Sequence, residues 1–169
     1  MDTLEAIFTR RSIRKYEQKA ISDEIMETLL RAGFHAPSAG NQQPWHFVIL
    51  DDRKILNVIP SFHPSSKMLQ NADKAILVCG DLFLEKFKGY WMIDCAAATE
   101  NILLAAHSMG LGACWLGLYP RNGRVTGMRK LLSLPTHIIP FALISLGHPA
   151  EVKAKVERFD RSRIHQNRW

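Results

Sequence analysis

The spacing of apolar side chains predicts two helices at the start of the chain. Leu4, Ile7 and Phe8 form a helical stripe that follows a capping-box-like start at Asp2 and ends near Arg11. A second helix is predicted after Ser22, a good N-cap residue that is followed by two acidic residues in the first turn. The buried face of this second helix consists of Ile25, Met26, Leu29 and Leu30.

Continuous apolar runs predict the strands of a sheet. Residues 46–50 form one run, and residues 74–79 form a second that is typical of a central strand covered on both faces. Residues 113–116 and 138–146 predict two more strands. Pro140 lies inside the last run and has no backbone N–H to donate, so it implies an edge position or a bulge.

Helical segments separate these strands. Short helices are predicted at residues 53–59, 65–71 and 122–132. The longest helix, residues 91–109, is apolar on nearly every side, which predicts that it is buried, with a subunit interface covering part of it. Gly110 ends this helix as a C-cap. The pattern predicts an α+β fold, in which helices flank a mixed central sheet.

The length of the chain suits one domain. We expect a single domain over residues 1–169, in which residues from about 150 to 169 form a C-terminal arm that docks on another surface. The composition, 47% hydrophobic and 22% charged residues, is ordinary for a globular protein. No signal-peptide pattern and no apolar run of about 20 residues is present, so we expect a cytoplasmic protein without a membrane partner.

The net charge and the cysteine and histidine content exclude several classes of function. The net charge of +6 is spread along the chain without an aromatic and basic binding module, which argues against a nucleic-acid partner and suits an oligomer that holds phosphorylated cofactors. Cys79, Cys95 and Cys114 are an odd set without C-x-x-C spacing, so we expect buried free thiols. The seven histidines show no metal-ligand spacing, and no metal site is predicted.

Two basic clusters lie at opposite ends of the chain. The first contains Arg10, Arg11, Ser12 and Arg14, and the second is the Arg161-Ser162-Arg163 segment. Each cluster by itself fits a solvated helix end or an exposed tail. Together they also fit a phosphate site, because arginine binds phosphate as a planar, permanently charged fork.

Two further segments are rich in small residues. Residues 36–45, Ala-Pro-Ser-Ala-Gly-Asn-Gln-Gln-Pro-Trp, form either an ordinary loop between a helix and a strand or a turn that a planar ligand can approach closely. Residues 110–117, Gly-Leu-Gly-Ala-Cys-Trp-Leu-Gly, lack the G-x-G-x-x-G pattern of dinucleotide-binding proteins. This second segment therefore predicts a helix stop and a strand.

The order RRSIRKY, APSAGNQQPW, GLGACWLG and RFDRSRIH resembles the nitroreductase-like family of FMN-dependent oxidoreductases. The resemblance extends from Phe8 to Trp169, and the P-S-x-x-N-x-Q-P-W pattern is its most specific part. It implies the nitroreductase-like fold and a homodimer with FMN at the interface.

The resemblance also assigns the phosphate end of the cofactor site. Arg10 and Ser12 are expected to bind the phosphate or ribityl oxygens of FMN, and Arg11 is expected to assist through its backbone. Arg161 and Arg163 would form the second half of the phosphate clamp.

The remaining implied contacts surround the flavin ring. Arg14 would lie near N1 and O2, and Lys67 is either a ligand of a pyrimidine oxygen or an ordinary exposed lysine. A backbone N–H of Gly117 or Leu118 would donate to N5. The loop across the interface would reach the partner's FMN through Pro37, Ser38, Ala39 and Asn41.

The resemblance implies an enzyme in which NAD(P)H gives a hydride to flavin N5 and a nitroaromatic, quinone or similar small planar acceptor is then reduced at the same site. One shared site predicts ping-pong kinetics, and no side chain is predicted to be catalytic. A lid around residues 62–90 is one possibility. The alternatives are a specialised flavin enzyme of this fold, for reductive dehalogenation, flavin fragmentation or enoate reduction, and a non-catalytic FMN-binding or regulatory protein.

Overall fold

A four-stranded sheet forms the centre of the protein in the computed structural model, which describes residues 1–169. Its strands lie in the order β1-β2-β4-β3, and every neighbouring pair is antiparallel. They are β1 (Trp45–Leu50), β2 (Lys74–Asp81), β3 (Gly112–Gly117) and β4 (Ile138–Gly147). The predicted α+β fold is confirmed, but the prediction of a mixed sheet is wrong. Apolar runs show where strands lie but not in which direction they run. The one parallel pairing is an isolated bridge between Ser12 and Ala113.

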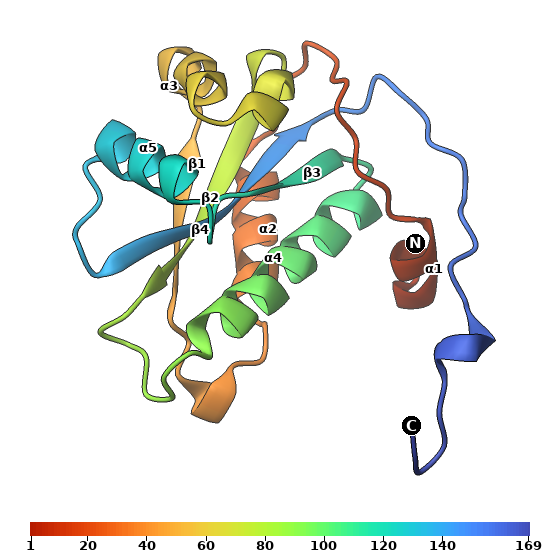
Figure 1. The fold of residues 1–169 in the computed structure, drawn as a ribbon. Coiled ribbons are helices and arrows are strands. Elements are labelled where there is room, and N and C mark those ends of the chain that lie inside the picture. Colours follow the sequence, from red (N-terminus) through yellow and green to blue (C-terminus); the bar gives the residue numbers. More distant parts are fainter.

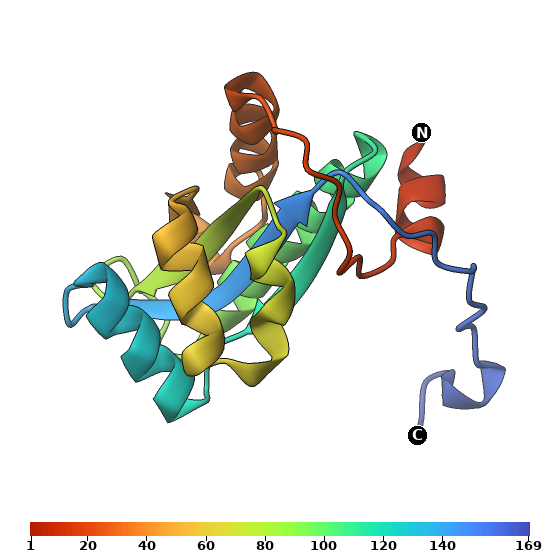
Figure 2. The same ribbon diagram turned by 90° about the horizontal axis from the view of Figure 1, so that it is seen from above.

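Helices cover both faces of the sheet (Figures 1 and 2). On one face, α2 (Asp23–Phe34) and α4 (Trp91–Ser108) pack against Ile76, Val78 and Ile144. On the other face, α3 (Arg53–Val58) and α5 (Asn122–Leu132) pack with two 3₁₀ segments, η2 (Ile59–Ser61) and η3 (Pro64–Gln70). Side chains alternate across each strand, so the two faces bury two separate hydrophobic cores.

Pro140 explains an irregularity at the centre of the sheet. β4 lies between β2 and β3, so Pro140 is not on an edge strand. The pairing of β2 with β4 shifts between Val78 and Cys79, and Cys79 is paired with Pro140. Of the two predicted alternatives, the bulge is therefore the one that the structure contains.

The first helix stands apart from the sheet and packs on the side of α4. Helix α1 (Thr3–Thr9) is capped by Asp2, and the hydroxyl of Thr9 lies 2.8 Å from His107 Nε2. Helix α4 itself is not enclosed, because Ile93 is 63% exposed. The single chain therefore leaves part of α4 uncovered, and the prediction that a subunit interface covers this part stays a prediction.

The chain leaves the sheet after β4 as an extended segment. Its start is fixed to the N-terminal segment, because the Ala150 N–H donates to the Lys15 carbonyl at 2.9 Å and Pro149 pairs with Tyr16. The arm (residues 150–169) then runs past α1 and contains one 3₁₀ turn, η4 (Arg161–Arg163) (Figure 1). No helix in the structure has both the length and the apolar character that crossing a membrane requires.

Candidate functional site

A pocket lined by cations lies where the chain leaves α1. This basic pocket has a volume of about 280 Å³ and is lined by Arg10, Arg11, Ser12, Arg14, Lys153 and Arg158. The N-terminal residues reach it because residues 12–13 run beside the free edge of β3, where the Ile13 N–H donates to the Ala113 carbonyl at 3.0 Å. The first four lining residues are the N-terminal cluster predicted from the sequence. Arg14 lines the same pocket as Arg10, and its expected place near N1 and O2 of the flavin stays a prediction.

Carboxylates behind the pocket hold its walls. Glu100 on α4 accepts a hydrogen bond from Arg10 Nε at 3.1 Å. Glu151 accepts the Arg14 N–H at 2.7 Å and pairs with the Lys153 ammonium at 2.6 Å. The Lys153 ammonium and the backbone N–H of Arg14 keep the pKa of Glu151 below its ordinary value. Neither carboxylate lines the pocket, so the lining side chains are five cations and one hydroxyl.

The chemistry of these donors fits the phosphate of FMN. A phosphate monoester carries a charge of about −1.5 to −2 at neutral pH and offers oxygens that only accept hydrogen bonds. The pocket provides five cationic side chains and the hydroxyl of Ser12. Guanidinium groups are the preferred protein partners of phosphate oxygens, because two parallel N–H donors match two of those oxygens.

The predicted loop of Pro37, Ser38, Ala39 and Asn41 is built around a buried carboxylate. Asp94 on α4 is 3% exposed and accepts the Ala39 N–H at 3.0 Å. Gln42 donates its side-chain N–H to the other oxygen of Asp94 at 2.6 Å. The side-chain oxygen Oε1 of Gln42 accepts the backbone N–H groups of Lys86 and Phe87 at 2.8 and 3.0 Å. Asp94 and Gln42 therefore join the loop to α4 and to the segment between β2 and α4.

The backbone of this loop is unusual. Gly40, Asn41 and Gln43 have positive φ angles of 50°, 52° and 47°. The Ser38 hydroxyl accepts the Gln43 N–H at 3.0 Å and stabilises this bend. Left-handed conformations at residues other than glycine cost free energy and occur often at functional sites. The cost is offset here by the hydrogen bonds to Asp94 and Ser38.

The structure does not bring this loop to the basic pocket within one chain. The loop contacts the N-terminal part of α4, whereas α1 packs against the C-terminal half of that helix (Figure 1). None of the four predicted loop residues lines the basic pocket. Pro37 and Asn41 are exposed, and Ser38 and Ala39 are half-buried.

The predicted backbone donors lie at the end of β3. The Leu118 N–H already donates to the Phe141 carbonyl at 3.1 Å. Because hydrogen bonds in an antiparallel ladder alternate, the N–H of Gly117 points away from β4, towards the free edge of the sheet. A Cβ added to Gly117 would meet no atom within 4 Å. Of the two predicted donors, only the Gly117 N–H is directed away from the ladder.

His63 and Arg124, which the sequence analysis did not single out, bind the backbone at the end of β3. The Gly117 carbonyl accepts hydrogen bonds from His63 Nε2 at 3.1 Å and from Arg124 Nη1 at 2.8 Å. His63 is 1% exposed, and its Nδ1 has no hydrogen-bond partner. Burial, together with the positive charge of Arg124, lowers the pKa of His63. The imidazole is therefore neutral at pH 7 and acts as a donor to Gly117.

Three predicted residues lie away from the basic pocket. Lys67 is exposed on η3. Arg161 and Arg163 are exposed on η4, and Arg163 pairs with Asp160 at 2.9 Å. The roles of Arg161 and Arg163 as phosphate ligands and of Lys67 as a ligand of a pyrimidine oxygen stay predictions. In the single chain, Lys153 and Arg158 are the residues of the arm that line the pocket.

The three cysteines are free and buried, as predicted. Burial raises the pKa of the Cys79 thiol to about 12 and raises the pKa of Cys95 and of Cys114 as well. Since the thiolate is the nucleophilic form, these side chains are unreactive at neutral pH.

Comparison with known proteins identifies the family. The family model described as Nitroreductase family matches residues 7–88 and 84–148. The chain belongs to this family. The resemblance predicted from the sequence is thus confirmed, and the match includes both the Arg10–Arg14 segment and the Pro37–Asn41 loop.

Individual relatives of this nitroreductase-family chain align with it over nearly its whole length. A protein of Methanothermobacter thermautotrophicus named "Putative NADH dehydrogenase/NAD(P)H nitroreductase" is 50% identical over 169 residues, which is 100% of this chain and 88% of the relative. An FMN-dependent nitroreductase of Clostridium difficile has a similar structure, with a TM-score of 0.90, 27% identity, and coverage of 98% of this chain and 99% of that one. NADPH:FMN oxidoreductase of Vibrio harveyi, solved with NAD⁺, gives a TM-score of 0.87 at 26% identity and covers 99% and 77% of the two chains.

Proposed function

We propose that this nitroreductase-family chain is an FMN-dependent oxidoreductase that oxidises NAD(P)H and reduces nitroaromatics, quinones or similar small planar acceptors. The basic pocket carries this proposal, because its lining of five cations and one hydroxyl suits a terminal phosphate. The names of the relatives, among them an FMN-dependent nitroreductase and an NADPH:FMN oxidoreductase, support it. When bound, FMN supplies the electron-carrying ring that the side chains of the protein lack.

The protein's own groups would bind and orient that ring. Arg10, Arg11, Ser12 and Arg14 line the basic pocket at the start of β3, and we propose that they would hold the phosphate end. The N–H of Gly117 is available at the other end of the same strand edge, where His63 and Arg124 fix the peptide. A strand rises about 3.3 Å per residue, so the edge between residues 113 and 117 spans roughly 13 Å. A nucleotide-sized ligand is long enough to lie along this edge.

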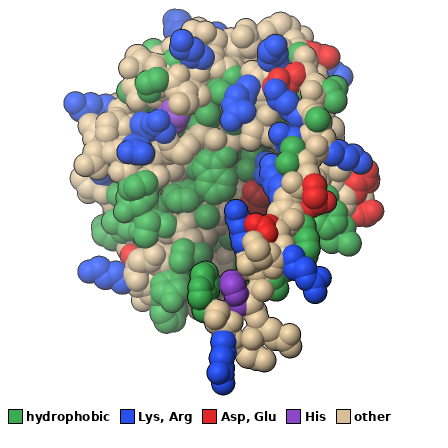
Figure 3. Space-filling view, turned by 45° about the vertical axis from the view of Figure 1, so that its right-hand side comes forward, with side chains coloured by type: hydrophobic (Ala, Val, Ile, Leu, Met, Phe, Trp, Pro, Cys, Tyr) green, Lys and Arg blue, Asp and Glu red, His purple; other side chains and the backbone are tan.

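A homodimer completes the proposed site. The Pro37–Asn41 loop does not reach the basic pocket of its own chain, so we infer that a second copy supplies it. Large apolar side chains are exposed on α1 and α4, with Phe8 69% and Ile93 63% exposed. Figure 3 shows hydrophobic side chains in the hollow between the body of the protein and the C-terminal segment. Burial of these side chains against a second chain would stabilise the dimer.

None of the three cysteines is poised as a nucleophile, since burial keeps their thiols protonated. We therefore propose that NAD(P)H and the acceptor occupy one site in turn, which gives ping-pong kinetics. The residues of the chain position both substrates, and solvent provides the protons that the reduced acceptor needs.

Purified protein provides the test. The visible spectrum should show bound flavin, FMN and not FAD should restore it after removal, and NADH or NADPH added without oxygen should bleach it. Arg10→Ala should weaken FMN binding by about 2–5 kcal/mol, because it removes one charge-assisted contact and leaves Glu100 without its partner. Protein that binds no flavin would refute the proposal. Bound FMN that stays oxidised with both nucleotides would instead indicate a non-catalytic FMN-binding protein.

A further inference from the structure

The net positive charge of the protein is concentrated on one face of the fold. The helical segments on the α3 and α5 side of the sheet lie within residues 53–72 and 121–132, which contain no aspartate or glutamate. The same residues contain seven of the 22 lysines and arginines: Arg53, Lys54, Lys67, Arg121, Arg124, Arg129 and Lys130. The other 15 cations face 16 carboxylates in the rest of the chain. The charge of +6 therefore arises on this surface, which we call the cationic face.

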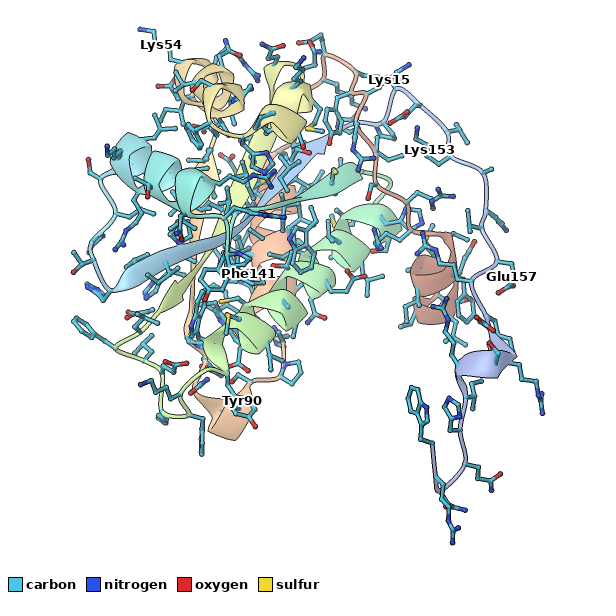
Figure 4. The ribbon with its side chains drawn as sticks, viewed as in Figure 1. Lys15, Lys54, Tyr90, Phe141, Lys153 and Glu157 are labelled. Carbon is cyan, nitrogen blue, oxygen red and sulfur yellow. The ribbon has the colours of Figure 1, made fainter.

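The charges of the cationic face are not neutralised within the chain. None of the seven side chains has a carboxylate within ion-pair distance. The Arg124 guanidinium donates to the Gly117 carbonyl at 2.8 Å and that of Arg129 to the Pro135 carbonyl at 2.7 Å, so both are fixed in place and keep their charge. Figures 1 and 2 show α3 and α5 side by side, and Figure 4 shows Lys54 extending from α3 away from the protein.

The cationic face borders the sheet edge where the flavin is proposed to lie. Arg124 contacts Gly117 directly, and Arg121 is the N-cap residue of the same helix. In an antiparallel strand the N–H and the carbonyl of one residue point to the same side. The Gly117 N–H, our proposed ligand donor, therefore lies beside the Arg124 guanidinium. Asp51 and Asp52, which precede α3, follow the end of β1 that lies away from Gly117.

This surface offers charge without an apolar or aromatic anchor. Val58, which is 46% exposed, is the one large apolar side chain of these segments that is open to solvent. Single-stranded nucleic acids bind to aromatic side chains on which their bases stack, and the cationic face exposes none. Complexes between electron-transfer proteins have small, weak interfaces, and complementary charge speeds their formation. The composition of the face therefore suits a transient protein partner with an acidic surface.

We propose that the cationic face docks a small acidic protein that carries one electron at a time and exchanges electrons with FMN beside Gly117. The inference rests on the proposed function, to which it adds a protein partner. Two reduced carriers would supply two electrons and water two protons, which together equal one hydride and one proton. Attraction to seven unpaired cations would accelerate the encounter with the carrier, and added salt would screen that attraction.

Reduced ferredoxin, a small acidic iron–sulfur protein, is the probe. Calorimetric titration measures its binding to the flavin-loaded protein, and anaerobic stopped-flow absorbance measures how fast it bleaches FMN. Both are measured in about 20 mM and about 500 mM salt, where the Debye length changes from roughly 20 Å to roughly 4 Å. Wild-type protein should bind ferredoxin in low salt, and the bimolecular rate constant should fall by about tenfold or more in high salt.

Two triple variants separate this face from the net charge of the protein. The test variant removes three exposed cations of the cationic face: Lys54→Gln, Arg121→Gln and Lys130→Gln. The matched control removes the same charge from exposed positions elsewhere: Lys19→Gln, Lys88→Gln and Arg168→Gln. In low salt the test variant should react with ferredoxin about tenfold more slowly than wild type, and the control within about twofold of it. Both should bind FMN and react with NADPH and NADH as wild type does.

The outcomes distinguish the inference from the proposed function. Wild-type protein that does not bind ferredoxin, equal losses in both variants, or binding without bleaching of FMN would each overturn the inference. Salt-dependent binding of a DNA duplex that only the test variant loses, without binding of ferredoxin, would assign the face to nucleic acid instead. Protein that binds no FMN would refute the proposed function, whereas FMN that NADPH bleaches and reduced ferredoxin does not would refute this inference alone.

Discussion

Replacing Gly117 by alanine would test where the cofactor lies along the sheet edge. The position carries a half-buried glycine at the end of β3, outside the left-handed region of backbone conformation. An added Cβ would meet no atom of the chain within 4 Å. The substitution therefore adds one methyl group to empty space beside the N–H that we propose as a ligand donor.

The expected effects on stability and on binding have opposite signs. Without a ligand, alanine should stabilise the protein by about 0.4–1 kcal/mol, because it restricts the unfolded chain and meets no steric conflict in the folded one. If FMN packs directly on the strand edge, the same methyl group occupies part of its space. Overpacking of this kind costs about 1–3 kcal/mol, which corresponds to a loss of FMN affinity of roughly 5- to 150-fold.

Urea unfolding of the apo-protein measures the first effect, and fluorescence titration with FMN measures the second. Gly123→Ala is the matched control: this glycine also has free space around an added Cβ, but it lies in α5 and not on the sheet edge. The control should gain stability and keep its FMN affinity. Unchanged FMN affinity in Gly117→Ala would show that the ligand lies elsewhere, and a less stable apo-protein would show that the edge is not open.

Three further predictions follow from the burial and pairing of particular groups. Burial lowers the pKa of His63, so this side chain binds a proton more readily in the unfolded chain than in the folded one. The free energy of unfolding should therefore fall as the pH drops below about 6.5. Urea titrations from pH 5 to 8 should show a smaller fall in His63→Gln. Sedimentation should detect a dimer at low micromolar concentration, and a folded, flavin-loaded monomer would contradict the split site. Cys79→Ala and Cys114→Ala should change stability more than flavin reduction in stopped-flow experiments, whereas a complete loss of reduction with normal FMN binding would assign chemistry to a thiol.

Local pattern was sufficient for most of the secondary structure. The helix at 122–132 was predicted with the boundaries that the structure has, and the last strand was predicted to start at residue 138, where it does start. Ser22 caps the second helix through a hydrogen bond to the Ile25 N–H, as its position in the sequence indicated. These features depend on neighbours within a few residues, so the sequence carries them directly.

Features that depend on distant parts of the chain could not be predicted in the same way. The relative direction of the strands is decided by how they connect, and apolar runs carry no record of it. Lys153 and Arg158 resemble the other cations of the arm until the fold brings them beside Arg10. Asp94 did carry a signal, because it is a carboxylate within an otherwise apolar helix turn, and such a residue normally needs buried partners.

The division of the proposed site between two chains links assembly to cofactor binding. If the Pro37–Asn41 loop of one copy contacts FMN held by the Arg10–Arg14 segment of the other, FMN binds more tightly to the dimer than to the monomer. By thermodynamic reciprocity, FMN must then strengthen the dimer by the same factor for each site. Asp94 and Gln42 contribute to this linkage, because their hydrogen bonds hold the loop in its left-handed conformation before the second chain binds. A loop that is already ordered has less conformational entropy to lose on binding, so its rigidity favours both dimerisation and cofactor affinity.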